Sequence, residues 1–303
     1  MKKLLVICGA TASGKTALAV ECAKRLGGEV VSCDALLVYR GLDIGTAKPT
    51  AEERGGIPHH MIDVVEPNEN FSVSDFERLA LPVVEEILAR GKVPVLCGGT
   101  GFYVKSLLFS HGYGNVAADR TLREKYERIA AEEGKAKLHA MLHALDPESA
   151  RSLHENDVKR VARALEIYEL TGKKKSEQND GEFSRYEYEA FAFDYPREQL
   201  YARIDARTDE MLRRGLTEEV KGLLHDGVHE EAQCMQGIGY KEVVQFLKKE
   251  YLYSTMSDII KQNTRRYAKR QLTFFKKLPN LHYLRPQDVQ QAAKEVIGIY
   301  DGE

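Results

Sequence analysis

Residues 9–16 are the part of the chain whose types and spacing most clearly suggest chemistry. They read Gly-Ala-Thr-Ala-Ser-Gly-Lys-Thr and fit the G-x-x-x-x-G-K-[ST] pattern of a phosphate-binding loop. In such a loop the backbone N–H groups converge on a phosphate group, the lysine adds a full charge and the threonine can hold Mg²⁺. The predicted phosphate site therefore consists of Gly9, Ala10, Thr11, Ala12, Ser13, Gly14, Lys15 and Thr16, with donors from residues 11–16 and Thr16 as the metal ligand.

A loop of this kind usually binds ATP or GTP, but the rest of the chain lacks the expected partners. A triphosphate site normally has a second strand that ends in an aspartate supporting Mg²⁺. The apolar run at 92–97 ends instead in Cys-Gly-Gly, and the acid that does follow a predicted strand is Asp34. The chain also has no guanine-reading N-K-x-D motif. The loop alone thus leaves open whether phosphate is transferred or departs.

Composition narrows the class of protein. The 303 residues are 43% hydrophobic and 30% charged, as in a soluble globular protein of one large or two modest domains. No apolar run approaches the roughly 20 residues of a transmembrane helix. The five cysteines form no C-x-x-C pair, which argues against a zinc site and a disulfide framework. We therefore expect a cytoplasmic protein with no membrane association.

The net charge of −2 does not by itself indicate a nucleic-acid-binding protein, but the distribution of charge is uneven. Seven Lys or Arg residues and no acid lie between Lys261 and Lys277, interleaved with Tyr267, Phe274 and Phe275. Such a run can be a solvated helix face. The missing acids favour, slightly, a face that binds a polyanion.

Secondary-structure patterns place the motifs at one edge of a sheet. Short apolar runs followed by glycine or Asp34 predict buried strands at 3–8, 29–33 and 92–97, with helices at 15–26 and 71–90, the latter capped by Ser72 or Ser74. Alternating strands and helices predict an α/β fold with a P-loop NTPase-like, mostly parallel sheet. Ligands bind such sheets beyond the carboxyl ends of the strands.

The strand pattern stops near residue 113 and resumes with YEAFAFDYP at 188–196. The intervening chain is charged and rich in helical spacing. We therefore expect a core of 1–112 and 191–303 and a helical insertion domain of 113–190. Further helices are predicted at 197–214, 217–226 and 254–278.

An ordered set of motifs carries a resemblance to a known family. These are GATASGKTALA, SCDALLVYRGLDIGTAKPT, GIPHHMIDV, FSVSDF, VLCGGTGFY, RVARALEIYELTGKKKSE and MQGIGYKE. In this order they resemble the tRNA dimethylallyltransferases, also called tRNA isopentenyltransferases, over nearly the whole chain. In lacking a zinc-finger tail, the sequence resembles the bacterial members of this family.

The resemblance implies a specific reaction. The phosphate compound would be dimethylallyl diphosphate, and diphosphate would leave with the help of Mg²⁺. The acceptor would be the N6 amine of adenine-37, beside the tRNA anticodon. Asp34 would accept the proton of that amine, and Arg207 would contact the diphosphate. Ordinary alternatives are a helix cap or Mg²⁺ support for Asp34. For Arg203, which lies four residues before Arg207, the alternative is surface pairing with Asp205, Asp209 or Glu210.

The resemblance also implies contacts to the anticodon stem-loop. The residues concerned are Asp34, Ala35, Leu36, Leu37, Gly101, Arg123, Lys159, Arg160, Val161, Ala162, Arg163, Gln236 and Lys241. Lys159 and Arg163 are four apart, which suits a basic helix face for phosphates, although a solvated face is the alternative for Lys159. Where the family usually has D-S-x-Q, this chain has Asp-Ala-Leu-Leu, and His154-Glu-Asn-Asp157 replaces H-P-N-D.

Two other functions compete with this reading. One is a small-molecule or nucleotide kinase with a helical lid, which the phosphate loop and the arginines would suit. The other is a tRNA-binding switch without catalysis. The order of the later motifs favours a prenyltransferase, which we expect to be a monomer.

Overall fold

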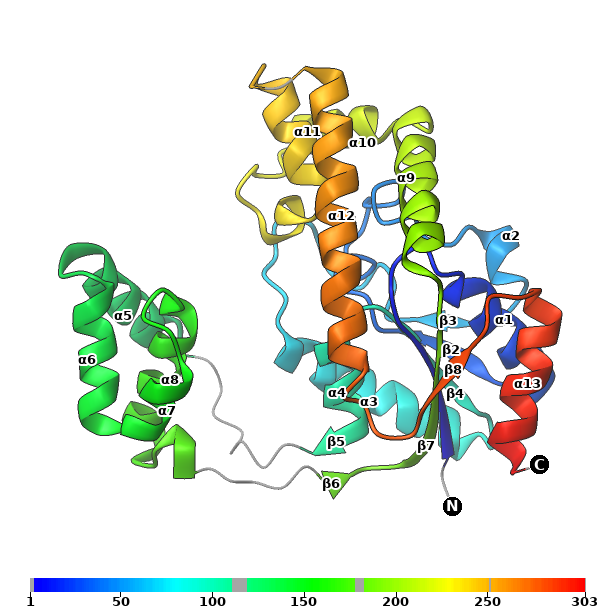
Figure 1. The fold of residues 1–303 in the computed structure, drawn as a ribbon, viewed down its shortest axis with the longest axis horizontal. Coiled ribbons are helices and arrows are strands. Elements are labelled where there is room, and N and C mark those ends of the chain that lie inside the picture. The colour runs from blue at the N-terminus through cyan, green and yellow to red at the C-terminus, as the bar shows by residue number, and fades with distance from the viewer. Residues whose placement is uncertain (1–2, 111–118, 178–182, 251, 303) are drawn as a thin grey trace. The chain divides into compact units, whose positions relative to one another are not determined.

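The computed structural model describes residues 3–110, 119–177, 183–250 and 252–302. The chain divides into two compact units (Figure 1). The first joins Met1–Leu108 to Arg185–Glu303, and the second is Phe109–Ser184. Both ends of the second unit therefore lie a few residues before the 113–190 expected from the sequence.

The first unit is built on a six-stranded sheet with the order β3-β2-β4-β1-β7-β8. Every neighbouring pair of these strands is parallel. The strands are β1 (Lys3–Cys8), β2 (Glu29–Ser32), β3 (His59–His60), β4 (Pro94–Gly98), β7 (Glu187–Phe193) and β8 (Leu281–Leu284). Strands β1, β2 and β4 confirm the three strands expected in the first hundred residues, whereas β3 and β8 were not predicted.

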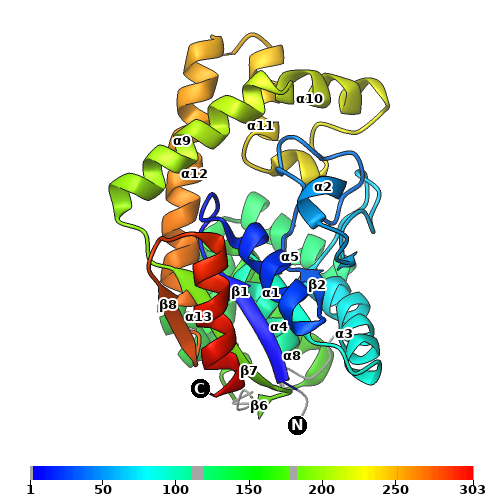
Figure 2. The ribbon, with the colours of Figure 1, turned by 90° about the vertical axis from the view of Figure 1, so that its right-hand side faces the viewer.

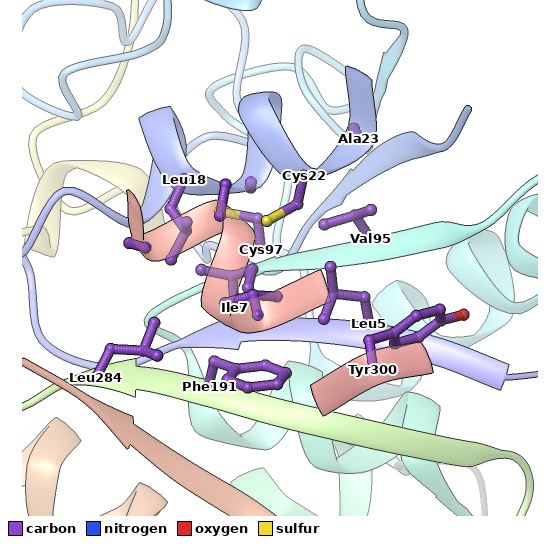
Figure 3. Packing of buried hydrophobic residues seen from close by; sticks show 14 of the residues in the cluster. Leu5, Ile7, Leu18, Cys22, Ala23, Val95, Cys97, Phe191, Leu284 and Tyr300 are labelled. Atoms are coloured by element: carbon purple, nitrogen blue, oxygen red, sulfur yellow. The ribbon is translucent and has the colours of Figure 1, made fainter. Parts of the chain in front are cut away.

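Helices cover both faces of this sheet. Figure 2 shows α1 (Lys15–Leu26) and α13 (Val289–Asp301) side by side on one face. On this face Leu5 and Ile7 of the sheet pack with Leu18 and Cys22 of α1 in a fully buried cluster (Figure 3). Helices α3 (Val73–Ala89) and α4 (Gly101–Leu108) lie on the other face.

Local sequence signals account for the ends of α1 and α3. Helix α1 ends at Gly27, whose φ of 62° lies in the left-handed region that glycine adopts without strain. Helix α3 begins at Ser72, which accepts a hydrogen bond from the Asp75 N–H while the Asp75 side chain accepts from the Ser72 N–H. Of the two candidate caps, Ser72 is therefore the one used.

The C-terminal half of the first unit is helical. Helices α9 (Arg197–Arg213), α10 (Leu216–His225) and α12 (Tyr253–Phe275) confirm the three helices expected there, and α11 (Tyr240–Leu247) is additional. A single-turn α2 (Ala51–Arg54) and a 3-10 turn, Gln233–Gln236, complete this unit. Helix α12 packs along α9 and reaches α4 (Figure 1). Among the described helices, none is long and apolar enough to cross a membrane.

The second unit is a small helical bundle. It contains α5 (Arg120–Glu132), α6 (Lys135–Leu145), α7 (Pro147–Ser152) and α8 (Val158–Thr171), followed by a 3-10 turn at Lys175–Glu177. Its core includes Leu138, Leu142, Val161 and Leu165. A two-residue antiparallel pair, β5 (Phe109–Ser110) with β6 (Phe183–Ser184), was not expected.

A buried carboxylate ties three strands of the sheet together. Glu29, at the start of β2, is 1% exposed and accepts hydrogen bonds from Arg90 at 2.6 and 2.9 Å, Lys92 at 2.8 Å and His60 at 2.8 Å. Arg90 and Lys92 precede β4, and His60 belongs to β3. The Arg90 guanidinium holds the pKa of the Glu29 carboxyl well below its usual range.

We expect Glu29→Gln to lower the free energy of unfolding at neutral pH by about 3 kcal/mol, since it breaks a buried charge network. A carboxyl whose pKa falls on folding stabilises the folded state above its ordinary pKa of 4.5. That contribution is lost as the pH falls towards the folded-state pKa. The difference from wild type, measured by urea unfolding, should therefore shrink in acid. Glu86→Gln, at an exposed acid that also approaches Arg90, is the matched control. A pH-independent deficit would contradict this assignment.

Candidate active site

The phosphate loop lies between β1 and α1, at the carboxyl edge of the sheet. Gly9 and Gly14 have φ values of 118° and 91°, in the region that favours glycine. A Cβ on Gly9 would also meet the Ala192 Cβ at 3.3 Å. Ala12 adopts a positive φ of 60°, an uncommon conformation for a residue with a side chain. The loop is thus folded tightly before Lys15 begins the helix.

Gln271 of α12 fixes one side of the loop. Its Oε1 accepts the Thr11 N–H at 2.9 Å, and its Nε2 donates to the Gly99 carbonyl at 2.9 Å. The Thr11 N–H, which the sequence pattern assigned to phosphate, is therefore already engaged. Donors from residue 12 onward remain for a ligand. A glutamine inside a basic helix gave no specific signal of this role.

A cavity of about 400 Å³ adjoins the loop. Four of the predicted phosphate-site residues line it: Thr11, Ala12, Lys15 and Thr16. Seven other predicted residues do so as well: Asp34, Ala35, Leu36, Leu37, Arg207, Gln236 and Lys241. Gly9, Ala10, Ser13 and Gly14 shape the loop without lining the cavity. Four segments distant in sequence therefore meet at one site.

Lys15 and Arg207 face this cavity, and neither has an ion-pair partner among the described residues. Lys15 Nζ donates to the Ala10 carbonyl at 2.6 Å, and Arg207 Nη2 donates to the Thr46 carbonyl at 3.2 Å. Burial lowers the pKa of both side chains, and the charge of Arg207 lowers that of Lys15 further. The charge of Asp34 offsets part of this effect and raises the pKa of both cations, but neither forms an ion pair with a described carboxylate.

Arg203, one turn before Arg207, has a different partner from the surface acids considered above. Its Nε donates to the Ala12 carbonyl at 2.8 Å, and its guanidinium lies 5.1 Å from the centre of the Tyr195 ring. It therefore holds the phosphate loop against α9.

Asp34 follows β2 and closes a turn of its own chain. Its Oδ1 accepts the N–H groups of Leu36 at 2.9 Å and Leu37 at 3.4 Å. The Ala35 N–H donates to Thr100 Oγ1 at 3.0 Å, which anchors the turn to the segment after β4. Asp34 Oδ2 has no donor among the described residues. Asp34 thus closes a turn with one oxygen and caps no helix, while the second oxygen stays available to a ligand.

Tyr267 and Cys97 also line the cavity and remain neutral. Burial, together with the nearby negative charge of Asp34, raises the pKa of Tyr267 to about 12. Burial raises the pKa of the Cys97 thiol to about 11. The carboxylate that faces this part of the cavity is therefore Asp34.

Glu219 of α10 holds the loop that supports Arg207. Its carboxylate accepts the three consecutive N–H groups of residues 43–45 at 2.9, 2.6 and 3.0 Å. The hydroxyl of the fully buried Tyr240 donates to the same carboxylate at 2.7 Å. A Cβ on Gly45 would lie 2.5 Å from the Tyr240 ring, so only glycine fits there. The next residue, Thr46, supplies the carbonyl that binds Arg207.

The remaining predicted contacts of the first unit have partners of their own. Gln236 Nε2 donates to the Glu230 carbonyl at 3.1 Å, and Lys241 lies 3.7 Å from the buried Glu242. Gly101 begins α4 outside the cavity, where a Cβ would lie 2.2 Å from the Phe274 ring. Glycine at this position permits close contact with α12.

In the second unit the predicted contacts separate into three groups. Val161 and Ala162 are 0% and 1% exposed and belong to the core of the bundle, so their side chains do not present a surface to RNA. Arg123 and Arg163 bind the fully buried Glu166 at 2.8 and 2.6 Å.

Lys159 and Arg160 have exposed side chains. Arg160 pairs with Asp157 at 3.3 Å, and Lys159 has no ion-pair partner among the described residues. Of the stretch 159–163, these two therefore present the accessible charge.

The parallel sheet, with helices on both faces and a cavity at its carboxyl edge, defines an α/β protein. The chain belongs to the IPP transferase family, whose sequence model matches residues 37–278. This membership disfavours the small-molecule kinase that the loop alone would also allow.

Relatives and solved structures agree with the family. The chain is 43% identical to the tRNA dimethylallyltransferase of Acetivibrio thermocellus, covering 97% of this chain and 95% of that protein. A crystal structure of the tRNA isopentenylpyrophosphate transferase of Bacillus halodurans superposes with a TM-score of 0.74 at 41% identity, covering 99% and 97%. A eukaryotic dimethylallyltransferase acting on tRNA superposes with a TM-score of 0.86 at 31% identity, covering 99% and 79%.

We expect Glu219→Gln to weaken binding of inorganic diphosphate, with Mg²⁺ present, by roughly tenfold. The amide cannot accept three N–H groups and a hydroxyl, and buried donors left unpaired cost about 1–3 kcal/mol each. The loop should then loosen, and Arg207 should lose its support. Isothermal titration calorimetry measures the change. Glu218→Gln, at the exposed neighbour on α10, should bind diphosphate normally. Wild-type affinity in the Glu219 variant would show that the loop does not depend on this clamp.

Proposed function

We propose that this protein transfers the dimethylallyl group of dimethylallyl diphosphate to N6 of adenine-37 in tRNA and releases diphosphate. The observation that carries the proposal is the arrangement of Lys15, Arg207 and Asp34 around one cavity. Two cations without ion-pair partners suit an anion that leaves, and the carboxylate suits a proton acceptor. The names of the relatives, tRNA dimethylallyltransferase and tRNA isopentenylpyrophosphate transferase, support the same chemistry.

The cations act on the leaving group. As the allylic C–O bond breaks, its electron pair moves to the diphosphate, and negative charge grows there. Donors fixed beforehand stabilise such charge most effectively, because they need not reorganise during the reaction. Lys15 is held by the Ala10 carbonyl and Arg207 by the Thr46 carbonyl, so both are positioned in the free protein.

Asp34 acts on the nucleophile. An exocyclic adenine amine attacks poorly because its lone pair is delocalised into the ring. As the N6–C bond forms, one amine proton must leave, and the oxygen of Asp34 that lacks a donor can accept it. Such help is worth roughly 10²- to 10⁴-fold in rate. To reach this half-buried group inside the cavity the base must leave the anticodon-loop stack, at a cost of a few kcal/mol.

The cavity fits small partners of this kind. Its volume of about 400 Å³ is within the range of roughly 300–1,000 Å³ that is typical of small-ligand sites. The side chains of Ala35, Leu36 and Leu37 give it an apolar wall beside Asp34. A prenyl chain and a flipped base both suit such a surface.

Thr16 would hold the Mg²⁺ of the proposed reaction. Its side chain is exposed to the cavity in the first turn of α1, as the phosphate-loop pattern requires. The described residues contain no cluster of three or more His, Cys, Asp or Glu suited to a metal. Such a donor set fits Mg²⁺, which keeps several waters and binds through substrate phosphates. When bound, the ion neutralises charge on the departing diphosphate.

For the second unit we propose contact with the anticodon stem. Lys159 and Arg160 present exposed charge on α8, and contacts to phosphates position a protein on RNA without reading its sequence. Arg123 and Arg163 serve first to satisfy Glu166. With tRNA as its substrate, the protein would act in the cytoplasm.

Product analysis tests the proposed reaction directly. Unmodified tRNA is incubated with Mg²⁺ and either labelled dimethylallyl diphosphate or labelled ATP, and the nucleosides are examined by mass spectrometry. Label from the prenyl donor on N6 of adenine-37 is expected. Phosphate transfer from ATP, or transfer of neither label, would overturn the proposal.

We expect Lys15→Ala and Arg207→Ala to slow single-turnover prenyl transfer by at least about 10²-fold, since each removes a charge that stabilises the leaving group. Neither side chain is assigned to RNA, so tRNA affinity should stay within a few fold. Arg213→Ala is the matched control, because this α9 arginine is exposed and pairs with Glu210. Transfer at the wild-type rate in either site variant, with saturating donor, would show that the substituted residue does not stabilise the leaving group.

The Asp34→Asn variant tests whether Asp34 accepts the proton of the amine or instead supports Mg²⁺. Asparagine keeps the shape and can still accept the Leu36 N–H, but it cannot take up the proton. Single-turnover transfer with both substrates saturating should fall by about 10²-fold or more at every Mg²⁺ concentration. Donor and tRNA affinities should remain near wild type. Recovery at high Mg²⁺ would assign Asp34 to the metal instead.

A further inference from the structure

An exposed aromatic pair lies where α4 meets α12. Phe102 is 62% exposed, and its ring centre lies 5.2 Å from that of Phe274 in an edge-to-face arrangement. The preceding residue, Gly101, allows this contact, because a Cβ there would overlap the Phe274 ring. A phenylalanine with most of its surface in solvent gains little from burial, so this position suits an external partner.

The surrounding face of α12 is basic and lacks acids. In the segment Lys261–Lys277 two cations pair with α9, Lys261 with Asp209 and Arg265 with Asp205. The other five cations of the segment make no ion pair with any residue that the structure describes. They are Arg266, Lys269, Arg270, Lys276 and Lys277. Their charge is free for an anionic partner.

This surface continues into the proposed active site. Tyr267, Arg270 and Gln271 of α12 line the cavity. Phe274 follows Arg270 by four residues, which places it on the same face of the helix about 6 Å further along the axis. The chain from Gly99 to Phe102 follows the same helix, since Gly99 bonds Gln271 and Phe102 contacts Phe274. The aromatic pair thus lies one helical turn from the cavity wall.

We propose that Phe102 and Phe274 form a stacking platform for a nucleotide next to the base that enters the cavity, with Arg270 contacting the phosphate between the two. The proposal rests on the proposed tRNA substrate. Unstacked RNA bases bind aromatic rings and arginine planes, and a basic groove follows the backbone. The Arg270 guanidinium lines the cavity and lies 5.9 Å from the Tyr267 ring centre, one helical turn before Phe274.

The platform also has a physical purpose in the reaction. Extruding a base breaks its stacking on both neighbours, and that loss must be offset. The side chains after Asp34, from Ala35 to Leu37, carry no hydrogen-bonding group. Stacking on Phe102 would replace the lost contact without requiring a particular base.

Three variants at Phe102 test the platform. With an unmodified anticodon stem-loop RNA, Phe102→Ala should raise the Kd and the KM for RNA by roughly tenfold or more, while kcat at saturating RNA stays within about twofold. Phe102→Leu keeps an apolar side chain but should show the same defect, and Phe102→Tyr should restore binding. Tyr253→Ala is the matched control. That tyrosine is 49% exposed and contacts Phe246 edge-to-face at the other end of α12.

A fluorescent base gives a direct readout of stacking. Stem-loop RNAs carry 2-aminopurine on either side of adenine-37. Wild-type protein should quench at least one of them, and Phe102→Ala should abolish that quenching at saturating protein. Equal RNA affinity and equal quenching in wild type and Phe102→Ala would overturn the proposal. So would a Phe102→Leu variant that binds RNA like wild type. Absence of prenyl transfer by the wild-type protein would instead contradict the proposed function.

Discussion

The site depends on Lys15 and Arg207, which face one cavity and form no ion pair within the part of the chain that the structure describes. Lys15 and Arg207 are each held by a single backbone carbonyl, and burial lowers the pKa of both. Bringing charge out of water without a counter-charge costs free energy. A bound diphosphate would supply that counter-charge. In this account the free protein holds both cations in place, and the diphosphate of the substrate provides their counter-charge when it binds.

Much of the surrounding structure keeps these charges in place. Gln271 fixes the phosphate loop, and Arg203 holds it against α9. Glu219 fixes the loop that positions Arg207. The order of the strands explains why these parts meet. Strand β1 lies between β4 and β7, so the loop after β1 is next to the turn after β4 on one side and α9 on the other.

The parts that could be predicted from the sequence depend on short-range patterns. The phosphate loop, the strands before it and after it, and the Ser72 cap each follow from a few neighbouring residues. The position of Asp34 follows from a parallel sheet edge. The burial of Val161 and Ala162 could also have been predicted, because together with Val158 and Leu165 they have the spacing of one apolar helix face.

Other contributions depend on contacts that no local pattern encodes. Glu219 lies far along the chain from the three N–H groups that it binds, and Gln271 lies far from Thr11. The sequences of strand β8 and helix α13 carry no motif that points to the site. These elements contribute to the fold because β8 pairs with β7 and α13 packs on α1. The fold decides which polar residues of a helix become part of the site.

Thermal unfolding with and without inorganic diphosphate tests the central claim most directly. If the charge of Lys15 lacks a counter-charge in the free protein, Lys15→Met should melt at the same temperature as the free wild-type protein or higher. Diphosphate with Mg²⁺ should raise the Tm of wild type in proportion to the logarithm of its concentration, by linkage, and should leave the variant unchanged. A Lys15→Met protein that melts several degrees below wild type, and is still stabilised by diphosphate, would contradict the account.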